Sequence, residues 1–158
     1  MKSSLKTGLS FGLTSGTITT LGLMIGLLAG TNSKLAVLAG ILTIAIADAL
    51  SDALGMHIST ESNKHNTNKE VWITTFATFF AKLFFATTFI IPILIFPLKT
   101  AAIISVIYGL LLITIFSYSI AKAKDEKPFG VILEHSLITV LVIVATYFVG
   151  DLINTFLK

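Results

Sequence analysis

The sequence has no cysteine and no arginine, and charged residues make up only 12% of its 158 residues. Without cysteine there is no disulfide, no thiolate metal site and no cysteine nucleophile. The eleven cations are all lysines, scattered one or two at a time. A nucleic-acid-binding protein gathers its cations on one face, so we expect no nucleic-acid partner. The charged fraction is about half that of a soluble domain, which leaves too little charge to cover a water-facing surface.

Motifs typical of the common enzyme classes are also missing. The sequence contains no helical zinc-protease motif, no phosphate-binding glycine loop and no serine nucleophile elbow. We therefore predict that the protein is not an enzyme and that it carries no resident cofactor.

Long apolar runs dominate what is present, with 54% apolar residues and a mean hydropathy of +0.93. A helix needs about 20 mostly apolar residues to cross a bilayer, about twice the length of a barrel strand. Five runs qualify, at residues 8–30, 35–57, 71–96, 101–120 and 131–157. The first follows lysines, as a signal peptide does, but it has no convincing cleavage site. We predict an all-α, multi-pass membrane protein whose single transmembrane domain, residues 1–158, has five spans.

The lysines near the ends of the runs predict the orientation, because lysine is enriched in cytoplasmic loops. Seven lie on the side of the N-terminus: Lys2, Lys6, Lys64, Lys69, Lys122, Lys124 and Lys127. Three lie on the other side: Lys34, Lys99 and Lys158. We therefore expect the N-terminus in the cytoplasm and the C-terminus on the opposite side.

The first run carries glycines at four-residue steps. Two such ladders are present: Gly8, Gly12 and Gly16, then Gly22, Gly26 and Gly30. Glycines at this spacing line one helix face and let a second backbone approach closely. The ladders predict tight helix packing, either inside the chain or at the seam of a homodimer.

The second run contains acids that a membrane span rarely holds. Asp48, Asp52 and Met56 are four residues apart and so share one helix face. Asp48 lies roughly 20 Å from Lys34 along a helix, inside a hydrocarbon core about 30 Å thick. An aspartate there costs about 2.5–3.5 kcal/mol on the insertion scale, and such residues commonly mark an ion or proton path. The alternative is a structural ion pair between Asp48 and Lys82, which lies midway along the third run.

Two carboxylates one turn apart repel each other unless a cation or a proton lies between them. Carboxylates together with an imidazole and a thioether suit a first-row metal such as iron or manganese. The candidate metal ligands are Asp48, Asp52, Met56, His57, Glu61 and Glu134. Some of these residues also fit a purely structural role. His57 and Glu61 also fit a solvated helix end, and Glu134 also fits a charge that stabilises the start of the last helix.

Two stretches resemble the vacuolar iron transporter family. Residues 11–22 read FGLTSGTITTLG, similar to the family's first-span signature, and residues 49–59 read ALSDALGMHIS, similar to its second-span motif. The similarity covers most of the chain and also includes Pro92, Pro97, Glu134, Tyr147 and Gly150. It implies a homodimer with five spans per chain. It also implies export of Fe²⁺ or Mn²⁺ from the cytosol in exchange for protons, along a path between the two first spans.

The sequence departs from the family at the intramembrane ligands. Ser15 stands where the family usually has an aspartate, Asp52 where it has methionine, and Met56 where it has glutamate. The family's glutamate-rich cytoplasmic region is absent, because the 58–70 loop is too short to hold it. We expect a divalent-metal transporter, with Asp48 and Asp52 supplying the charge lost at Ser15. The alternatives are a transporter of another cation on the same fold and a non-transporting membrane scaffold.

Overall fold

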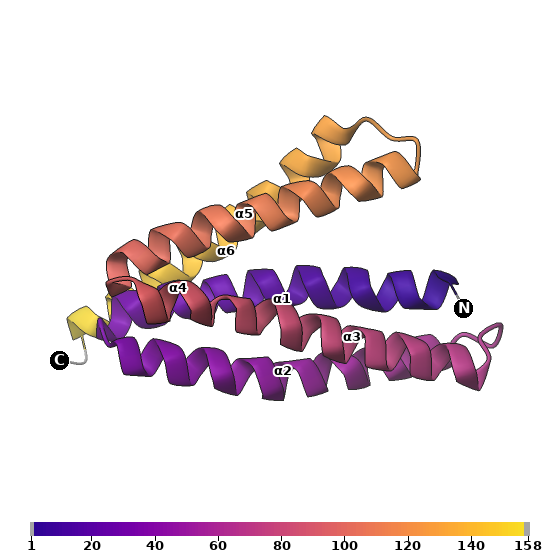
Figure 1. Ribbon diagram of the computed structural model, residues 1–158, viewed down its shortest axis with the longest axis horizontal. Coiled ribbons are helices and arrows are strands. Elements are labelled where there is room, and N and C mark those ends of the chain that lie inside the picture. Colours follow the sequence, from indigo (N-terminus) through magenta and orange to yellow (C-terminus); the bar gives the residue numbers. More distant parts are fainter. Residues whose placement is uncertain (1, 157–158) are drawn as a thin grey trace. The chain divides into compact units, whose positions relative to one another are not determined.

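The computed structural model describes residues 2–156, and it confirms an all-α membrane protein. The helices are α1 (Lys2–Thr31), α2 (Lys34–Glu61), α3 (Asn68–Thr88), α4 (Ile90–Ile95), α5 (Leu98–Ala123) and α6 (Pro128–Phe156), and Figure 1 labels them. Among the described residues, five helical segments are long and apolar enough to cross a bilayer, with α3 and α4 together forming the third. The protein is therefore an integral, multi-pass membrane protein.

Local sequence signals explain where these helices end. Asn32, directly after α1, and Asp125, after α5, both have positive φ, 47° and 55°. This left-handed conformation ends a helix, and asparagine and aspartate tolerate it better than most residues. The start of α3 is a capping box, in which the Thr67 side chain accepts from the Glu70 N–H while the Glu70 carboxylate accepts from the Thr67 N–H at 3.0 Å. These polar signals hold the turns between the apolar segments.

The third span is broken at Phe89, between α3 and α4. Pro92 has no N–H, and its ring clashes with the carbonyl four residues earlier, which belongs to Thr88, the last residue of α3. Phe89 instead donates its N–H to the Ala86 carbonyl at 3.3 Å, a tighter turn than an α-helix makes. The proline thus explains a break that its position near the end of the apolar run did not predict.

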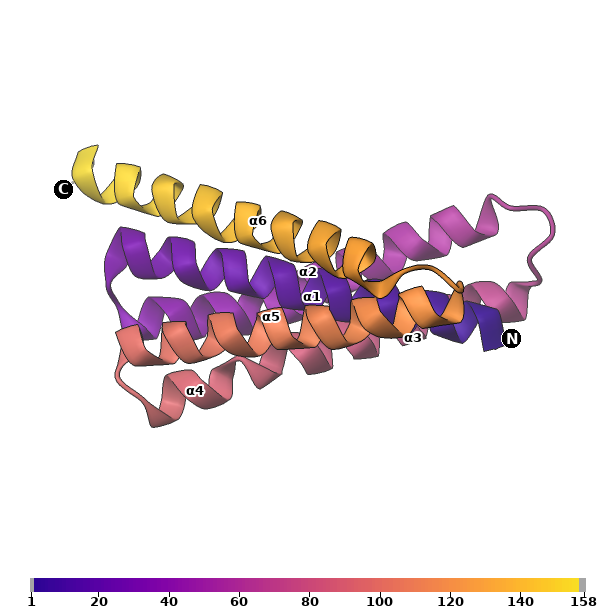
Figure 2. The same ribbon diagram turned by 90° about the horizontal axis from the view of Figure 1, so that it is seen from above.

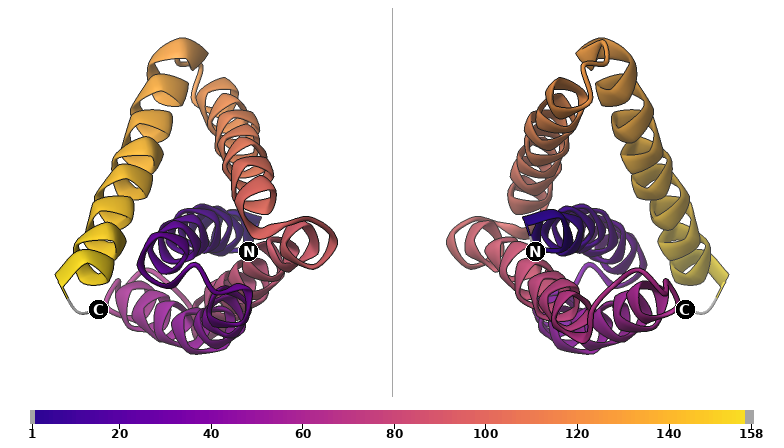
Figure 3. Two further views of the ribbon diagram at one scale, coloured as in Figure 1. Left: turned by 90° about the vertical axis from the view of Figure 1, so that its left-hand side faces the viewer. Right: turned by 90° about the vertical axis from the view of Figure 1, so that its right-hand side faces the viewer.

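The residues group into two compact units: Met1–Thr20 with Ile41–Ile90, and Leu21–Gly40 with Ile91–Lys158. In the first unit, the N-terminal half of α1, the C-terminal half of α2, and α3 run side by side (Figures 1 and 3). In the second, α5 and α6 form a hairpin, visible in Figure 2. Because α1 and α2 each contribute to both units, the units are not consecutive chain segments, and the single domain of residues 1–158 stays a prediction.

The first glycine ladder packs against α3 within the first unit. A Cβ atom added at Gly8 would lie 2.5 Å from the Thr74 carbonyl oxygen, and one at Gly12 would lie 2.5 Å from the Thr78 oxygen. Any side chain at these positions would push the two backbones apart. The sequence prediction of tight packing is confirmed here, and the partner helix lies in the same chain.

The second ladder packs against α6 within the second unit. A Cβ atom at Gly26 would lie 3.2 Å from the Thr146 carbonyl oxygen, and one at Gly30 would lie 3.3 Å from the Gly150 oxygen. Both ladders therefore serve contacts inside one chain, which was one of the two interpretations of the spacing. The homodimer stays a prediction, and the ladders do not support it.

Candidate functional site

The two acids of the second span meet a lysine and a serine inside the first unit. Asp48 and Asp52 lie one turn apart on α2, and the Lys82 ammonium on α3 forms ion pairs with Oδ2 of both. Ser15 on α1 donates a hydrogen bond from Oγ to Asp52 Oδ2 at 2.6 Å and accepts one from Lys82 Nζ at 2.8 Å. Three helices thus bring four polar side chains to one place, which we call the acid–lysine cluster.

Gly16 makes room for the lysine. A Cβ atom at this position would lie 3.2 Å from both Cα and Cγ of Lys82. The glycine next to Ser15 therefore lets the lysine side chain pass close to α1 on its way to the aspartates. Gly16, the last glycine of the first ladder, thus lets Lys82 reach the cluster and also lets α1 pack closely against α3.

The members of the cluster differ in burial. The Lys82 side chain is 1% exposed, whereas those of Asp48 and Asp52 are 28% and 21% exposed. Asp48 Oδ2 accepts no hydrogen bond from the described residues, so its contact with the ammonium is an ion pair held by charge. With both acids ionised and the lysine protonated, the formal charge of the cluster is −1. The two carboxylates are thus partly exposed, while the lysine that pairs with them is buried.

The sequence indicated only part of this arrangement. An Asp48–Lys82 pair was one alternative from the sequence, and the structure shows it. The sequence did not indicate that Asp52 shares the same ammonium or that Ser15 bridges the two. One signal was available: Ser15 occupies the position at which the resembling family usually has an aspartate. In this chain the Ser15 hydroxyl therefore joins the acid–lysine cluster at the position where the family has a carboxylate.

The helix-end candidates lie in a separate arrangement. The His57 imidazole Nδ1 lies 2.9 Å from Thr75 Oγ1 on α3, and its ring meets that of Trp72 edge to face at 4.8 Å. His57 Nε2 is 4.0 Å from Glu61 Oε2, and the Glu61 side chain is 67% exposed. These contacts are those of a helix end near the loop. The imidazole is engaged with α3 rather than with the aspartates.

The remaining candidates do not complete a metal-binding group. Met56 is half-buried, and its carbonyl accepts a hydrogen bond from Thr60 Oγ1 at 2.6 Å. Glu134 is exposed on α6, in the second unit. Within residues 2–156, no three His, Asp or Glu side chains are grouped so as to hold a metal ion. Of the six candidates, the structure brings together Asp48 and Asp52, around a lysine that the sequence did not count as part of the site.

Two buried hydroxyls follow Ser15 along α1. Thr17 and Thr20 are fully buried, and Oγ1 of each has no hydrogen-bond partner among the described residues. Threonine hydroxyls elsewhere in these helices bond to the carbonyl four residues earlier, as Thr19 does to Ser15 at 2.8 Å. A buried polar group without a partner costs about 1–3 kcal/mol. Such groups are typical places for an ion or an ordered water to bind.

Neither a scan against protein-family models nor a search of curated proteins finds a match for this chain. The resemblance to the vacuolar iron transporters therefore depends on the first-span and second-span motifs together with the matching residues Pro92, Pro97, Glu134, Tyr147 and Gly150. The fold and the cluster define a class more broadly: a multi-pass, all-α membrane protein with two acids and a lysine paired within its spans.

Proposed function

We propose that the protein is a membrane transporter of divalent metal ions, iron or manganese, which it exports from the cytosol in exchange for protons. The observation that carries the proposal is the pair of carboxylates inside a span, with a single lysine as their counter-ion. Ionisable residues within membrane spans are expensive and commonly mark ion pathways. Both acids are also partly exposed, at 28% and 21%, whereas the lysine is buried.

The cluster supplies a reason for exchange. Two carboxylates one turn apart repel each other, and either a divalent cation or protons relieve that repulsion. A divalent cation that binds between Asp48 and Asp52 also has to displace the Lys82 ammonium, which pairs with both acids. The metal ion and protons therefore compete for the same carboxylates.

The donor atoms favour a hard or borderline divalent cation. The two carboxylates and the Ser15 hydroxyl are oxygen donors, which suit Mn²⁺ and Mg²⁺ better than soft ions. Mn²⁺ therefore suits the donor atoms of the site. It is also more stable in air than Fe²⁺, so we would use Mn²⁺ as the substrate in transport measurements.

The route away from the cluster follows α1. Thr20 lies five residues beyond Ser15, about 7.5 Å along the helix axis, and its hydroxyl and that of Thr17 have no partner among the described residues. We assign these hydroxyls to the pathway that continues from the cluster towards the opposite side of the membrane. A cytoplasmic N-terminus, predicted from the lysines, makes this the direction of export.

A homodimer belongs to the same proposal through the family resemblance. The glycine faces of α1 contact helices of their own chain, so a dimer would use another surface. Its assembly is measured independently, from the mass of the purified protein in detergent.

Uptake of Mn²⁺ into proteoliposomes tests the function. We expect the Asp48→Asn, Asp52→Asn double variant to insert normally and to lose uptake, because the amides keep the size of the side chains and remove their charge. Asp151→Asn is the matched control: it makes the same change at an exposed acid on α6 that forms no ion pair within the described residues. Wild-type uptake in the double variant would refute the assignment of the site.

A non-transporting membrane scaffold is the second candidate, favoured by the same ion pairs and by the intramolecular glycine contacts. In that case the acid–lysine cluster only joins α1, α2 and α3. Proteoliposomes with correctly folded wild-type protein would then take up no more Mn²⁺ than protein-free vesicles at any imposed pH gradient.

A further inference from the structure

A ridge of aromatic side chains runs along α3 on the outside of the first unit. Trp72, Phe76 and Phe80 follow each other at four-residue steps and are 53%, 53% and 60% exposed. Their rings stack with centroid distances of 5.5 and 6.4 Å. This aromatic ridge lies on α3, which is part of a segment long and apolar enough to cross a membrane.

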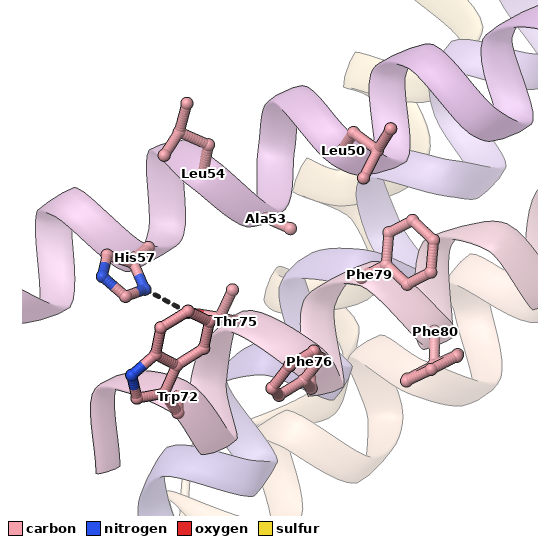
Figure 4. Close-up of a pocket in the computed structure, with 9 residues that line it drawn as sticks. All are labelled: Leu50, Ala53, Leu54, His57, Trp72, Thr75, Phe76, Phe79 and Phe80. Atoms are coloured by element: carbon pink, nitrogen blue, oxygen red, sulfur yellow. Dashed lines mark hydrogen bonds between the residues drawn. The ribbon is translucent and has the colours of Figure 1, made fainter. Parts of the chain in front are cut away.

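A groove lies on each side of the ridge. The first, between α2 and α3, has a volume of about 370 Å³. Figure 4 shows Leu50 and Leu54 of α2 across from the phenylalanine rings of α3, with His57 and Trp72 at one end. Its lining is almost wholly apolar. The polar side chains His57 and Thr75 lie at one end, where they contact each other.

The second groove lies between α1 and α3 and has a volume of about 520 Å³. Leu5 and Leu9 of α1 face Ile73 and Ala77 of α3, and Lys69 lies at the end nearest the loop. Trp72, Phe76 and Phe80 line both grooves, so the ridge is the wall between them. Both volumes fall in the range of pockets that bury small ligands.

The charge at the loop end is positive on the side of the second groove. Lys69 lines the second groove, Lys6 follows Leu5 on α1, and Lys64 lies in the loop before α3; all three are exposed, and none forms an ion pair within the described residues. The two nearby acids are engaged: Glu61 lies beside His57, at the end of the first groove, and Glu70 caps α3. Lys69 therefore has no ion-pair partner among the described residues that an anion at this membrane surface would have to displace.

We propose that one anionic diacyl phospholipid straddles the ridge, with one acyl chain in each groove and its phosphate at Lys69. Two apolar grooves that share one wall fit two chains joined at one end. Tryptophan commonly lies at the headgroup level of a bilayer, which places Trp72 beside the glycerol and leaves the phenylalanines among the chains. This inference depends on the membrane-spanning fold and is independent of metal transport.

The chain provides its own probe, because Trp72 is its only tryptophan. We would reconstitute the protein in vesicles of brominated phosphatidylcholine mixed with unlabelled phosphatidylglycerol, and in vesicles with the label on the other lipid, and measure quenching of the Trp72 fluorescence. We expect phosphatidylglycerol to bind the site about fivefold more tightly than phosphatidylcholine. This is the factor that corresponds to about 1 kcal/mol for one lysine near an anionic headgroup. Salt should reduce this preference, because Lys69 is exposed.

Lys69→Gln removes the charge and leaves the grooves intact. We expect it to abolish the preference for phosphatidylglycerol and to leave quenching by phosphatidylcholine unchanged. Lys99→Gln, at an exposed lysine in the second unit, is the matched control and should keep the preference. Brominated lysophosphatidylglycerol should compete more weakly than the diacyl lipid, because one chain fills only one groove.

Two results would overturn the proposal. Equal quenching by both headgroups in the wild-type protein would mean that the ridge meets only exchanging bulk lipid. Quenching by neither lipid, recovered when the protein is diluted into excess lipid, would mean that a second copy of the chain covers the ridge.

Discussion

Replacing Lys82 with methionine separates a cation site from a purely structural ion pair. The change keeps an unbranched, apolar side chain of similar length and removes the ammonium from between Asp48 and Asp52. Breaking a buried ion pair by removing one partner costs about 3–5 kcal/mol. The two carboxylates are 28% and 21% exposed, and partial screening by solvent lowers the cost. We therefore expect a loss of about 3 kcal/mol in the free energy of unfolding.

A metal should restore most of this loss if the cluster binds cations. A ligand at 100 times its dissociation constant stabilises a folded protein by about 2.7 kcal/mol. Saturating Mn²⁺ would therefore bring Lys82→Met close to wild-type stability. The wild-type protein should respond less, because the metal must first displace the ammonium.

Unfolding of the purified protein in detergent, with and without Mn²⁺, measures both effects. Lys99→Met is the control, since Lys99 is exposed and forms no ion pair among the described residues. The triple variant Asp48→Asn, Asp52→Asn, Lys82→Met should be insensitive to Mn²⁺, because it has no charge left in the cluster. A Lys82→Met protein that is destabilised and gains nothing from Mn²⁺ would refute the cation site and favour the scaffold.

Three further predictions address the packing, the topology and the missing family ligand. Gly16→Ala should cost about 1–3 kcal/mol of stability by crowding Lys82, whereas Gly55→Ala, where an added Cβ meets nothing within 4 Å, should be neutral or slightly stabilising; equal effects in thermal unfolding would contradict the role of Gly16. A reporter fused after Lys158 should read out the side opposite the cytoplasm, and a cytoplasmic signal would invert the topology or change the number of spans. Ser15→Asp should lower stability without metal, by adding a third carboxylate, and tighten Mn²⁺ binding measured by titration; unchanged binding would place Ser15 outside the site.

The five spans follow directly from the sequence, because each apolar run is long enough to require a membrane. The ends were less predictable. The first run was placed at residues 8–30, whereas α1 is Lys2–Thr31. Hydropathy marks only the part of a helix that lies in hydrocarbon, while the backbone hydrogen bonds continue into the polar residues beside it.

The acid–lysine cluster shows where sequence reasoning stops. The spacing of Asp48 and Asp52 placed both acids on one face of α2, and Lys82 was the one cation in the middle of a span. The contribution of Ser15 depends on how α1 is rotated about its own axis, which neither composition nor periodicity determines. The Gly16–Lys82 contact fixes that rotation. The glycine ladder was visible in the sequence, and its partner helix was not.

Simultaneous recording of Mn²⁺ entry and proton counter-flow in proteoliposomes tests the central claim most directly. With the wild-type protein we predict that Mn²⁺ uptake is accompanied by protons moving the other way, that an opposing pH gradient stops uptake, and that Asp48→Asn with Asp52→Asn abolishes both fluxes. The Asp151→Asn control should retain both. Uptake that proceeds without proton movement would contradict the exchange of a metal ion for protons, and uptake that persists in the double variant would contradict the site itself.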